Sequence, residues 1–173
     1  MESCMLMIPD ITLADEIRAY RQAFLDSGDS MDGTGSLRRH ENPADWLAEN
    51  ERCASWDTVP EGWVPATQFV CVRDGKIIGM IQVRHELNDY LAQFGGHIGY
   101  SVRPDERRKG YAAQMLHDVL PYCRKIGLER VLITCNADNE GSRKTILKNG
   151  GVYENTVYEP GEECGTQRYW ITL

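Results

Sequence analysis

Apolar residues recur at the helical spacing of three and four positions in two long stretches of the chain. One stretch runs from Leu13 to Leu25, and the other runs from Ala112 to Ile126. This spacing gathers the apolar side chains on one face of a helix. Ser27 and Gly28 end the first pattern, and Gly127 ends the second. The chain is therefore expected to form helices from about 13 to 27 and from about 110 to 126.

Strand-forming residues dominate several shorter stretches. The runs TQFVCVR and KIIGMIQVRHE flank Asp74 and Gly75, a dipeptide that favours a type I′ turn, and so predict a β-hairpin. Other expected strands lie at Cys4–Ile8 and in the runs HIGYSVR, RVLITC, VYENTVY and RYWITL. RVLITC is almost wholly apolar, which is typical of a strand covered on both faces.

The order of these elements predicts the fold class. Shorter helices are expected from Asn42 to Cys53 and from Glu140 to Lys148. HIGYSVR, the helix from 110 to 126 and RVLITC form a strand–helix–strand unit, which implies a right-handed crossover and parallel pairing. We expect an α/β chain of the α+β type in a single domain, residues 1–173. Its mixed sheet would be antiparallel in the N-terminal hairpin and parallel at its centre, with helices on both faces.

Composition narrows the function classes. The chain has 173 residues, 42% of them apolar, and a formal net charge of −7. This acidic balance disfavours nucleic-acid binding, and no apolar run is long enough to cross a bilayer. The N-terminus has no cationic segment typical of a signal peptide, so we expect a cytoplasmic protein with no nucleic-acid or membrane partner.

Six cysteines are present, none in a C-x-x-C pair. They are Cys4, Cys53, Cys71, Cys123, Cys135 and Cys164. No spacing among them and the four histidines matches a zinc site, so no metal is expected. We interpret all six as free thiols, with Cys123 and Cys135 buried.

Three of the four tryptophans lie close together in an irregular stretch between residues 46 and 63. They are Trp46, Trp56 and Trp63. Large aromatic side chains in such a stretch can line a pocket. They can equally anchor a long connection to the core. The sequence leaves both readings open.

A basic loop contrasts with the acidic chain. Four of the 19 basic residues lie between Arg103 and Lys109, directly before Gly110 and the expected helix. Backbone N–H groups at a helix start lack intrahelical acceptors and carry partial positive charge, so a phosphate fits there. Small residues at Gly110 and Ala112 would let a pyrophosphate approach closely. The alternative is a solvated basic turn.

The loop resembles the coenzyme A loop of the GNAT (GCN5-related) N-acetyltransferases, whose pattern is Gln/Arg-x-x-Gly-x-Gly/Ala. Arg107, Gly110 and Ala112 match its three defined positions. Asn139 and Ser142 stand where that family usually has an asparagine and a small residue opening the next helix. The similarity covers about residues 66 to 158.

This resemblance implies an acetyl-CoA-dependent N-acetyltransferase that acts on a primary amine of a small molecule or peptide, as a monomer or homodimer. Acetyl-CoA would lie where the central parallel strands splay apart, with its pyrophosphate on the loop and its pantetheine arm beside the preceding strand. The implied cofactor-binding residues are Tyr100, Ser101, Val102, Arg107, Arg108, Lys109, Gly110, Tyr111, Ala112, Asn139 and Ser142.

Two positions depart from the family pattern. Many members have a tyrosine seven residues after the asparagine, as a general acid toward the departing thiolate, and this chain has Ile146 there. Gly151 replaces the aromatic residue that usually follows Gly150. These departures keep open a noncatalytic acyl-CoA-binding or sensing module. A nucleotide-phosphate loop is a weaker third reading, because Gly-Lys-Ser/Thr is absent.

Acetyl transfer to an amine requires the amine to be neutral, and an alkylamine is mostly protonated at pH 7. His97 and Glu86 lie near the expected splay and are the candidate general bases. A histidine at a strand start can also be a hydrogen-bonded structural residue. Asn139 likewise has a second role, as the N-cap of the following helix.

Overall fold

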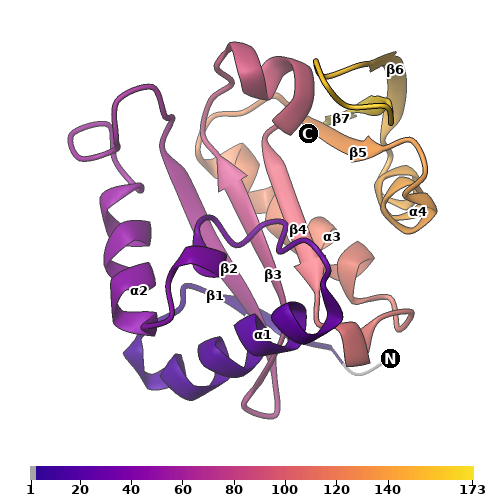
Figure 1. Cartoon of the computed structure of the whole chain (residues 1–173). Helices are drawn as coiled ribbons and strands as arrows, with labels where there is room; N and C mark the ends of the chain where they lie inside the picture. The colour runs from indigo at the N-terminus through magenta and orange to yellow at the C-terminus, as the bar shows by residue number, and fades with distance from the viewer. Residues whose placement is uncertain (1–2) are drawn as a thin grey trace.

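The computed structural model describes residues 3–173 and contains the helices and strands that the hydrophobic pattern predicts (Figure 1). The strands are β1 (Met5–Met7), β2 (Ala66–Arg73), β3 (Lys76–Arg84), β4 (Ile98–Val102), β5 (Arg130–Asn136), β6 (Val152–Val157) and β7 (Thr166–Thr172). The helices are α1 (Ala14–Ser27), α2 (Pro43–Arg52), α3 (Tyr111–Lys125) and α4 (Glu140–Lys148). Short turns are η1 (Ile11–Leu13), η2 (Leu37–Arg39), η3 (Leu91–Gly95) and η4 (Pro104–Glu106).

The helix ends follow local signals in the sequence. Gly28 ends α1 in the left-handed conformation, with φ of 72°. The Asn42 side chain caps α2 by accepting a hydrogen bond from the N–H of Ala44, and Pro43 occupies the first turn. The predicted hairpin is also confirmed, because Asp74 and Gly75 have φ of 50° and 78°, as a type I′ turn requires.

The strands form two sheets, ordered β1-β2-β3-β4 and β5-β7-β6. Every pair in the described chain is antiparallel, so the expected mixed sheet with a parallel centre is not what the structure shows. The N–H of His97 donates to the Leu132 carbonyl over 2.7 Å, where β4 approaches β5. Beyond this point β4 and β5 form no ladder within the described residues, and the Tyr100 side chain of β4 reaches α4, where its hydroxyl lies 2.6 Å from Ser142 Oγ.

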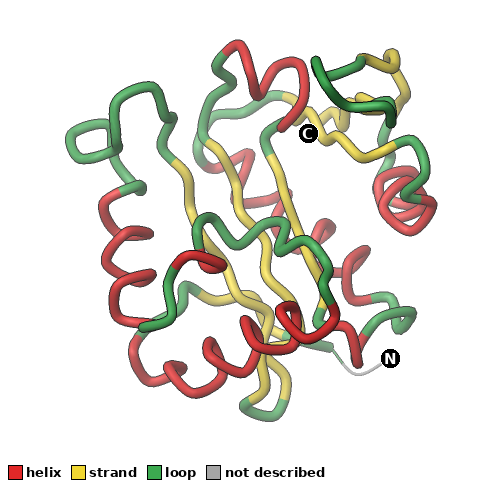
Figure 2. The backbone as a smooth tube through the Cα atoms, in the orientation of Figure 1, coloured by secondary structure: helices red, strands yellow, loops and turns green. Residues whose placement is uncertain are grey.

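Two apolar clusters hold helices on both faces of the first sheet, as predicted. On one face, α1 and α2 pack Tyr20, Phe24 and Trp46 against the strands. On the other, α3 contributes a cluster that includes Met115 and Leu116. Figure 2 shows α1 crossing in front of the lower ends of the strands and α2 beside them on the left, with helical segments also behind the strands. Burying both faces fixes β4, and with it the start of α3, inside the molecule.

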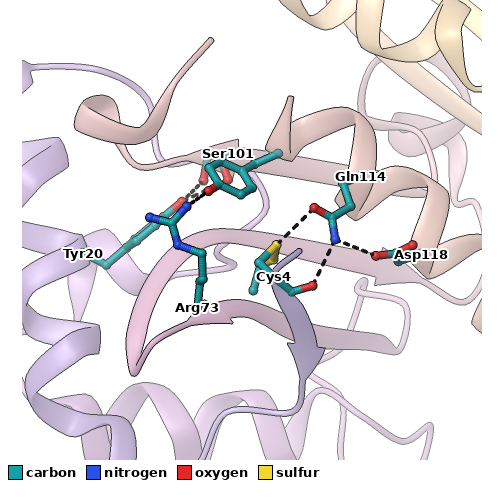
Figure 3. Close-up of a disulfide and its surroundings, with 8 residues drawn as sticks. Cys4, Tyr20, Arg73, Ser101, Gln114 and Asp118 are labelled. Atoms are coloured by element: carbon teal, nitrogen blue, oxygen red, sulfur yellow. Dashed lines mark hydrogen bonds between the residues drawn. A yellow bond between two sulfur atoms is a disulfide. The ribbon is translucent and has the colours of Figure 1, made fainter. Parts of the chain in front are cut away.

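The interpretation of all six cysteines as free thiols is wrong for one pair. Cys4 and Cys71 form a disulfide with a Cα–Cα distance of 5.7 Å (Figure 3). They are 67 positions apart, and pairing of β1 with β2 brings them together. The other four cysteines are free, and Cys123 and Cys135 are buried as expected.

The tryptophans divide between the two expected roles. Trp46 is fully buried, and its indole N–H donates to the Thr34 carbonyl over 2.8 Å, so it anchors the long connection after α1. Trp63 is 45% exposed and lines a surface cavity. Within residues 3–173, no helix has the length and apolar character needed to cross a membrane. The same residues contain no group of three or more His, Cys, Asp or Glu side chains placed to hold a metal.

Candidate active site

The loop between β4 and α3 is built around backbone geometry. Gly110 has φ of 87° directly before the first residue of α3, and Arg108 has φ of 61°. A left-handed residue at the helix start turns the chain so that the first amides of α3 have no intrahelical acceptor. These amides and the positive end of the helix form a site suited to phosphate oxygens.

Glu106 organises this loop, although it was not among the residues nominated from the sequence. Its side chain is buried, and its two carboxylate oxygens each accept a 2.8 Å hydrogen bond, one from Lys76 and one from Lys109. The bonds from Lys109 and Lys76 lower the pKa of Glu106 to about 2. The available sequence signal was an acidic pair, Asp105 and Glu106, within a basic run. Its effect is to hold the Lys109 ammonium in an ion pair.

A cavity of about 520 Å³ lies between this loop, β4 and α4. It is lined by every predicted cofactor-binding residue except Lys109. The lining also includes Asp29, Ser30 and Asp32 from the connection after α1. The structure thus brings the nominated residues of three separate segments together, and excludes Lys109 because Glu106 binds it.

Arg107 is held at the wall of this cavity by protein groups. Its Nη1 donates to Asp29 Oδ2 over 2.7 Å, and its Nε donates to the Val102 carbonyl over 3.1 Å. The hydrogen bond from Arg107 also lowers the pKa of Asp29. Because the guanidinium already has these partners, the loop amides are the more available donors for an anionic ligand.

The start of α4 closes the opposite wall. Asn139 Oδ1 accepts a 3.0 Å hydrogen bond from the N–H of Ser142, so Asn139 caps the helix while also lining the cavity. Burial raises the pKa of the Tyr100 hydroxyl, which therefore stays protonated at neutral pH. The position of Asn139 thus allows it both to cap α4 and to contact a ligand in the cavity.

Ile146 lines neither the first cavity nor its neighbour on the other side of Tyr100. Its side chain is fully buried in the core beneath α4. A β-carbon on Gly151 would lie 2.3 Å from Ile146 Cγ2 and 2.9 Å from the Ile146 carbonyl oxygen, so glycine at position 151 lets the chain pass close to the end of α4.

A second cavity, of about 530 Å³, adjoins the first and shares Asp32, Tyr100 and Ser142 with it. Its ionisable lining residues include Asp32, Arg84, Tyr90 and Glu159. Burial, followed by the nearby Glu159 carboxylate, raises the pKa of Tyr90. The wall common to both cavities is the place where two ligands can meet.

Neither base candidate lines either cavity. His97 is 5% exposed, and its Nδ1 accepts a 2.9 Å hydrogen bond from the N–H of Leu132. Burial, with a smaller contribution from Arg84, lowers its pKa to about 4. The imidazole is thus neutral at pH 7, but its acceptor nitrogen is already used by the backbone. Glu86 is exposed, two residues beyond the end of β3.

The fold and cavities define an α+β protein whose loop at the start of α3 has a geometry suited to an anion. A sequence model of the Acetyltransferase (GNAT) family matches residues 35–150. The chain belongs to this family.

A curated relative agrees with this assignment. The uncharacterized N-acetyltransferase YoaA of Bacillus subtilis (strain 168) is 33% identical over 79 residues, which cover 43% of this chain and 45% of YoaA. The match therefore spans less than half the length of that relative.

Solved structures share the fold. A ribosomal-protein-S5-alanine acetyltransferase from Vibrio fischeri has a TM-score of 0.72 at 19% identity, covering 99% of this chain and 94% of that one. The microcin C7 self-immunity acetyltransferase MccE, in complex with acetyl-CoA and AMP, has a TM-score of 0.67 at 18% identity, covering 100% of this chain and 94% of its own.

Proposed function

We propose that the protein transfers the acetyl group of acetyl-CoA to a primary amine. The observation that carries this proposal is the pair of adjoining cavities, one bounded by the helix-start loop and the other by ionisable side chains. A cofactor with a pyrophosphate fits the first cavity, because Gly110 and the first amides of α3 offer close, preorganised donors. An amine acceptor would enter through the second.

Each nominated cofactor residue has a place in this proposal. The loop Arg107–Ala112 binds the pyrophosphate through its amides, with Arg108 adding positive charge. Tyr100, Ser101 and Val102 lie along the pantetheine arm between the diverging strands β4 and β5, and Asn139 and Ser142 meet it from α4. Lys109 is held in an ion pair with Glu106, so it contributes to binding only through the electrostatic field at the loop.

The reaction needs a neutral amine and a leaving thiol. Acetyl-CoA supplies an activated thioester whose thiol is a fair leaving group. The acceptor ammonium first loses one proton; its nitrogen then bonds to the acetyl carbon as the carbon–sulfur bond breaks, and its second proton ends on the sulfur. The protein's contribution is to hold both groups at the wall formed by Tyr100 and Asp32.

The base that accepts the first proton is not assigned by this geometry. His97 would have to release the Leu132 N–H, and Glu86 lies outside both cavities. Their direct roles remain predictions from the sequence, and deprotonation by water before binding is the simpler route. With a confirmed acceptor, a general base replaced by alanine or glutamine would lower kcat/KM by about 10²- to 10⁴-fold. If kcat/KM of His97→Ala and of Glu86→Gln each stays within threefold of wild type, neither residue is the general base.

The direct test is release of free CoA thiol from acetyl-CoA in the presence of a panel of amines. Amino acids, polyamines, aminoglycosides and short peptides cover the main chemical classes. Amine-dependent thiol release with an acetylated product by mass spectrometry is expected. Tight CoA binding without turnover on the whole panel would contradict the proposal and support the noncatalytic alternative, which the buried Ile146 keeps relevant.

A further inference from the structure

Arg84, at the end of β3, lies where the second cavity meets a third one of about 400 Å³. Its Nη1 donates to the carbonyls of Gly95 and Gly96 over 3.2 and 3.5 Å, which fixes the guanidinium. Its Nε and Nη2 have no protein acceptor in residues 3–173, and no carboxylate oxygen of that part of the chain lies within 4.0 Å. The side chain is half-buried at the two cavities, and Asp32 acts on its charge electrostatically without a direct ion pair.

Three cations near the first cavity differ in this respect, because each has a carboxylate partner: Arg103 with Asp105, Arg107 with Asp29, and Lys109 with Glu106. Burial lowers the pKa of Arg84, but a guanidinium stays protonated at neutral pH. A partly desolvated cation that makes no direct ion pair is costly, and an anionic group of a ligand that bonds to it would relieve that cost.

The Asp32 carboxylate lies close enough to Arg84 to interact with it electrostatically, and the backbone shows how the two segments meet. A β-carbon on Gly99 would lie 3.3 Å from both Arg84 Nη2 and the Gly33 nitrogen. A β-carbon on Gly33 would lie 2.3 Å from the Gly99 carbonyl oxygen. The loop that carries Asp32 and the Arg84 guanidinium therefore both lie against β4, one residue before Tyr100. Asp32 and Glu159 give the second cavity negative charge beside this fixed positive charge.

We propose that the acceptor is a zwitterion of the amino-acid type, whose carboxylate binds Arg84 while its amine lies near Asp32, at the wall shared with the first cavity. This inference rests on the proposed acetyltransferase function and names its substrate class. A guanidinium binds a carboxylate through two parallel hydrogen bonds, which would orient the amine as well as hold it. Arg84 is then a positioning residue of the acceptor site.

Two other acceptor classes fit this charge arrangement less well. The first residue of a peptide has a neutral amide in place of the carboxylate, which leaves Arg84 unpaired. A polyamine carries only positive charges, and Arg84 would repel one of them. A site built to bind a charged group discriminates strongly against an analogue that lacks it.

The test compares each of the twenty amino acids with its own carboxamide, at saturating acetyl-CoA, by thiol release. The expected result is an amino acid whose kcat/KM exceeds that of its amide by about 10- to 100-fold. Arg84→Met keeps the aliphatic stem and should remove this preference, lowering kcat/KM for the acid by a similar factor, mainly through KM. The value for the amide should change little. Compared with Arg84→Met, Arg84→Lys should lose less kcat/KM for the acid, because lysine keeps the positive charge but cannot form the two parallel hydrogen bonds of a guanidinium.

Arg18→Met is the matched control, because Arg18 is exposed on α1 and pairs only with Asp15 in the described chain. Calorimetric CoA affinity shows whether the Arg84 variants are folded. If carboxylate-free amines are preferred, or if Arg84→Met changes acid and amide alike with CoA binding intact, the inference is overturned while the acetyltransferase function stands. CoA binding without turnover on any amine overturns both.

Discussion

Gly110 is the residue on which the proposed binding of CoA should depend most. Gly110→Glu adds bulk and negative charge where a phosphate must approach the amides of α3, and should abolish CoA binding measured by calorimetry. Gly127→Glu is a matched control: Gly127 has φ of 94° at the far end of the same helix, with nothing within 4 Å of an added β-carbon. Both variants carry the strain of a left-handed non-glycine residue. Equal CoA affinity in wild type and Gly110→Glu would refute the loop assignment.

Ile146 tests whether the missing tyrosine matters. Ile146→Tyr places a larger, polar ring in a filled core against Gly151, so we expect a loss of about 1 to 3 kcal/mol in unfolding free energy, measured in urea. Activity on a confirmed acceptor should not rise. Leu147→Tyr, at a half-exposed neighbouring position, should change stability by less than about 0.5 kcal/mol. An increase in kcat for Ile146→Tyr would show that a tyrosine acid can act there after all.

At the scale of elements, β1 is a three-residue edge strand that depends on cross-links. Cys4 is bonded to Cys71, and Gln114 donates from α3 to the Cys4 carbonyl over 3.1 Å (Figure 3). The bridge closes a long loop of the unfolded chain, so the Cys4→Ala/Cys71→Ala variant should lose about 2 to 4 kcal/mol of stability. Cys53→Ala, at a free cysteine, is the control.

Thiol titration of the denatured, unreduced protein checks the bridge itself, with four reactive thiols expected. Six would show that both cysteines are reduced in the isolated protein. Such bridges are rare in reducing compartments, so the count also bears on the expected cytoplasmic location.

At the scale of the whole molecule, His97 joins the two sheets through Leu132, and its ionisation should set part of the acid stability. The unfolded chain binds a proton at His97 below pH 6.5, whereas the folded protein does so only near pH 4. Stability is therefore complete above pH 6.5 and falls on acidification toward pH 4, by about 3 kcal/mol in total. Burial also lowers the pKa of His85, which adds a loss of the same sign.

The variant His97→Asn keeps an acceptor for the Leu132 N–H and cannot ionise. Urea unfolding between pH 4.5 and 6.5 should show a flatter pH dependence for this variant than for wild type. His117→Asn, at an exposed position, should retain the wild-type slope. An unchanged slope in His97→Asn would mean that the folded protein protonates His97 freely.

The sequence by itself determined the helices and strands and marked the loop before α3 as the candidate cofactor site, because both depend on local chemistry. Apolar spacing set α1 and α3, Asp74 and Gly75 set the hairpin turn, and the basic run before Gly110 marked the helix start. These signals act within a few residues of one another and need no knowledge of the fold.

Only the tertiary structure decided how distant segments meet. Pairing of β1 with β2 joined Cys4 to Cys71 across 67 positions, and β4 and β5 came to lie in separate sheets. Packing also buried His97 on a backbone N–H and brought Asp32 close enough to Arg84 to interact with it electrostatically. Such contacts depend on side chains far apart in the chain filling one space, which no local pattern of residues encodes.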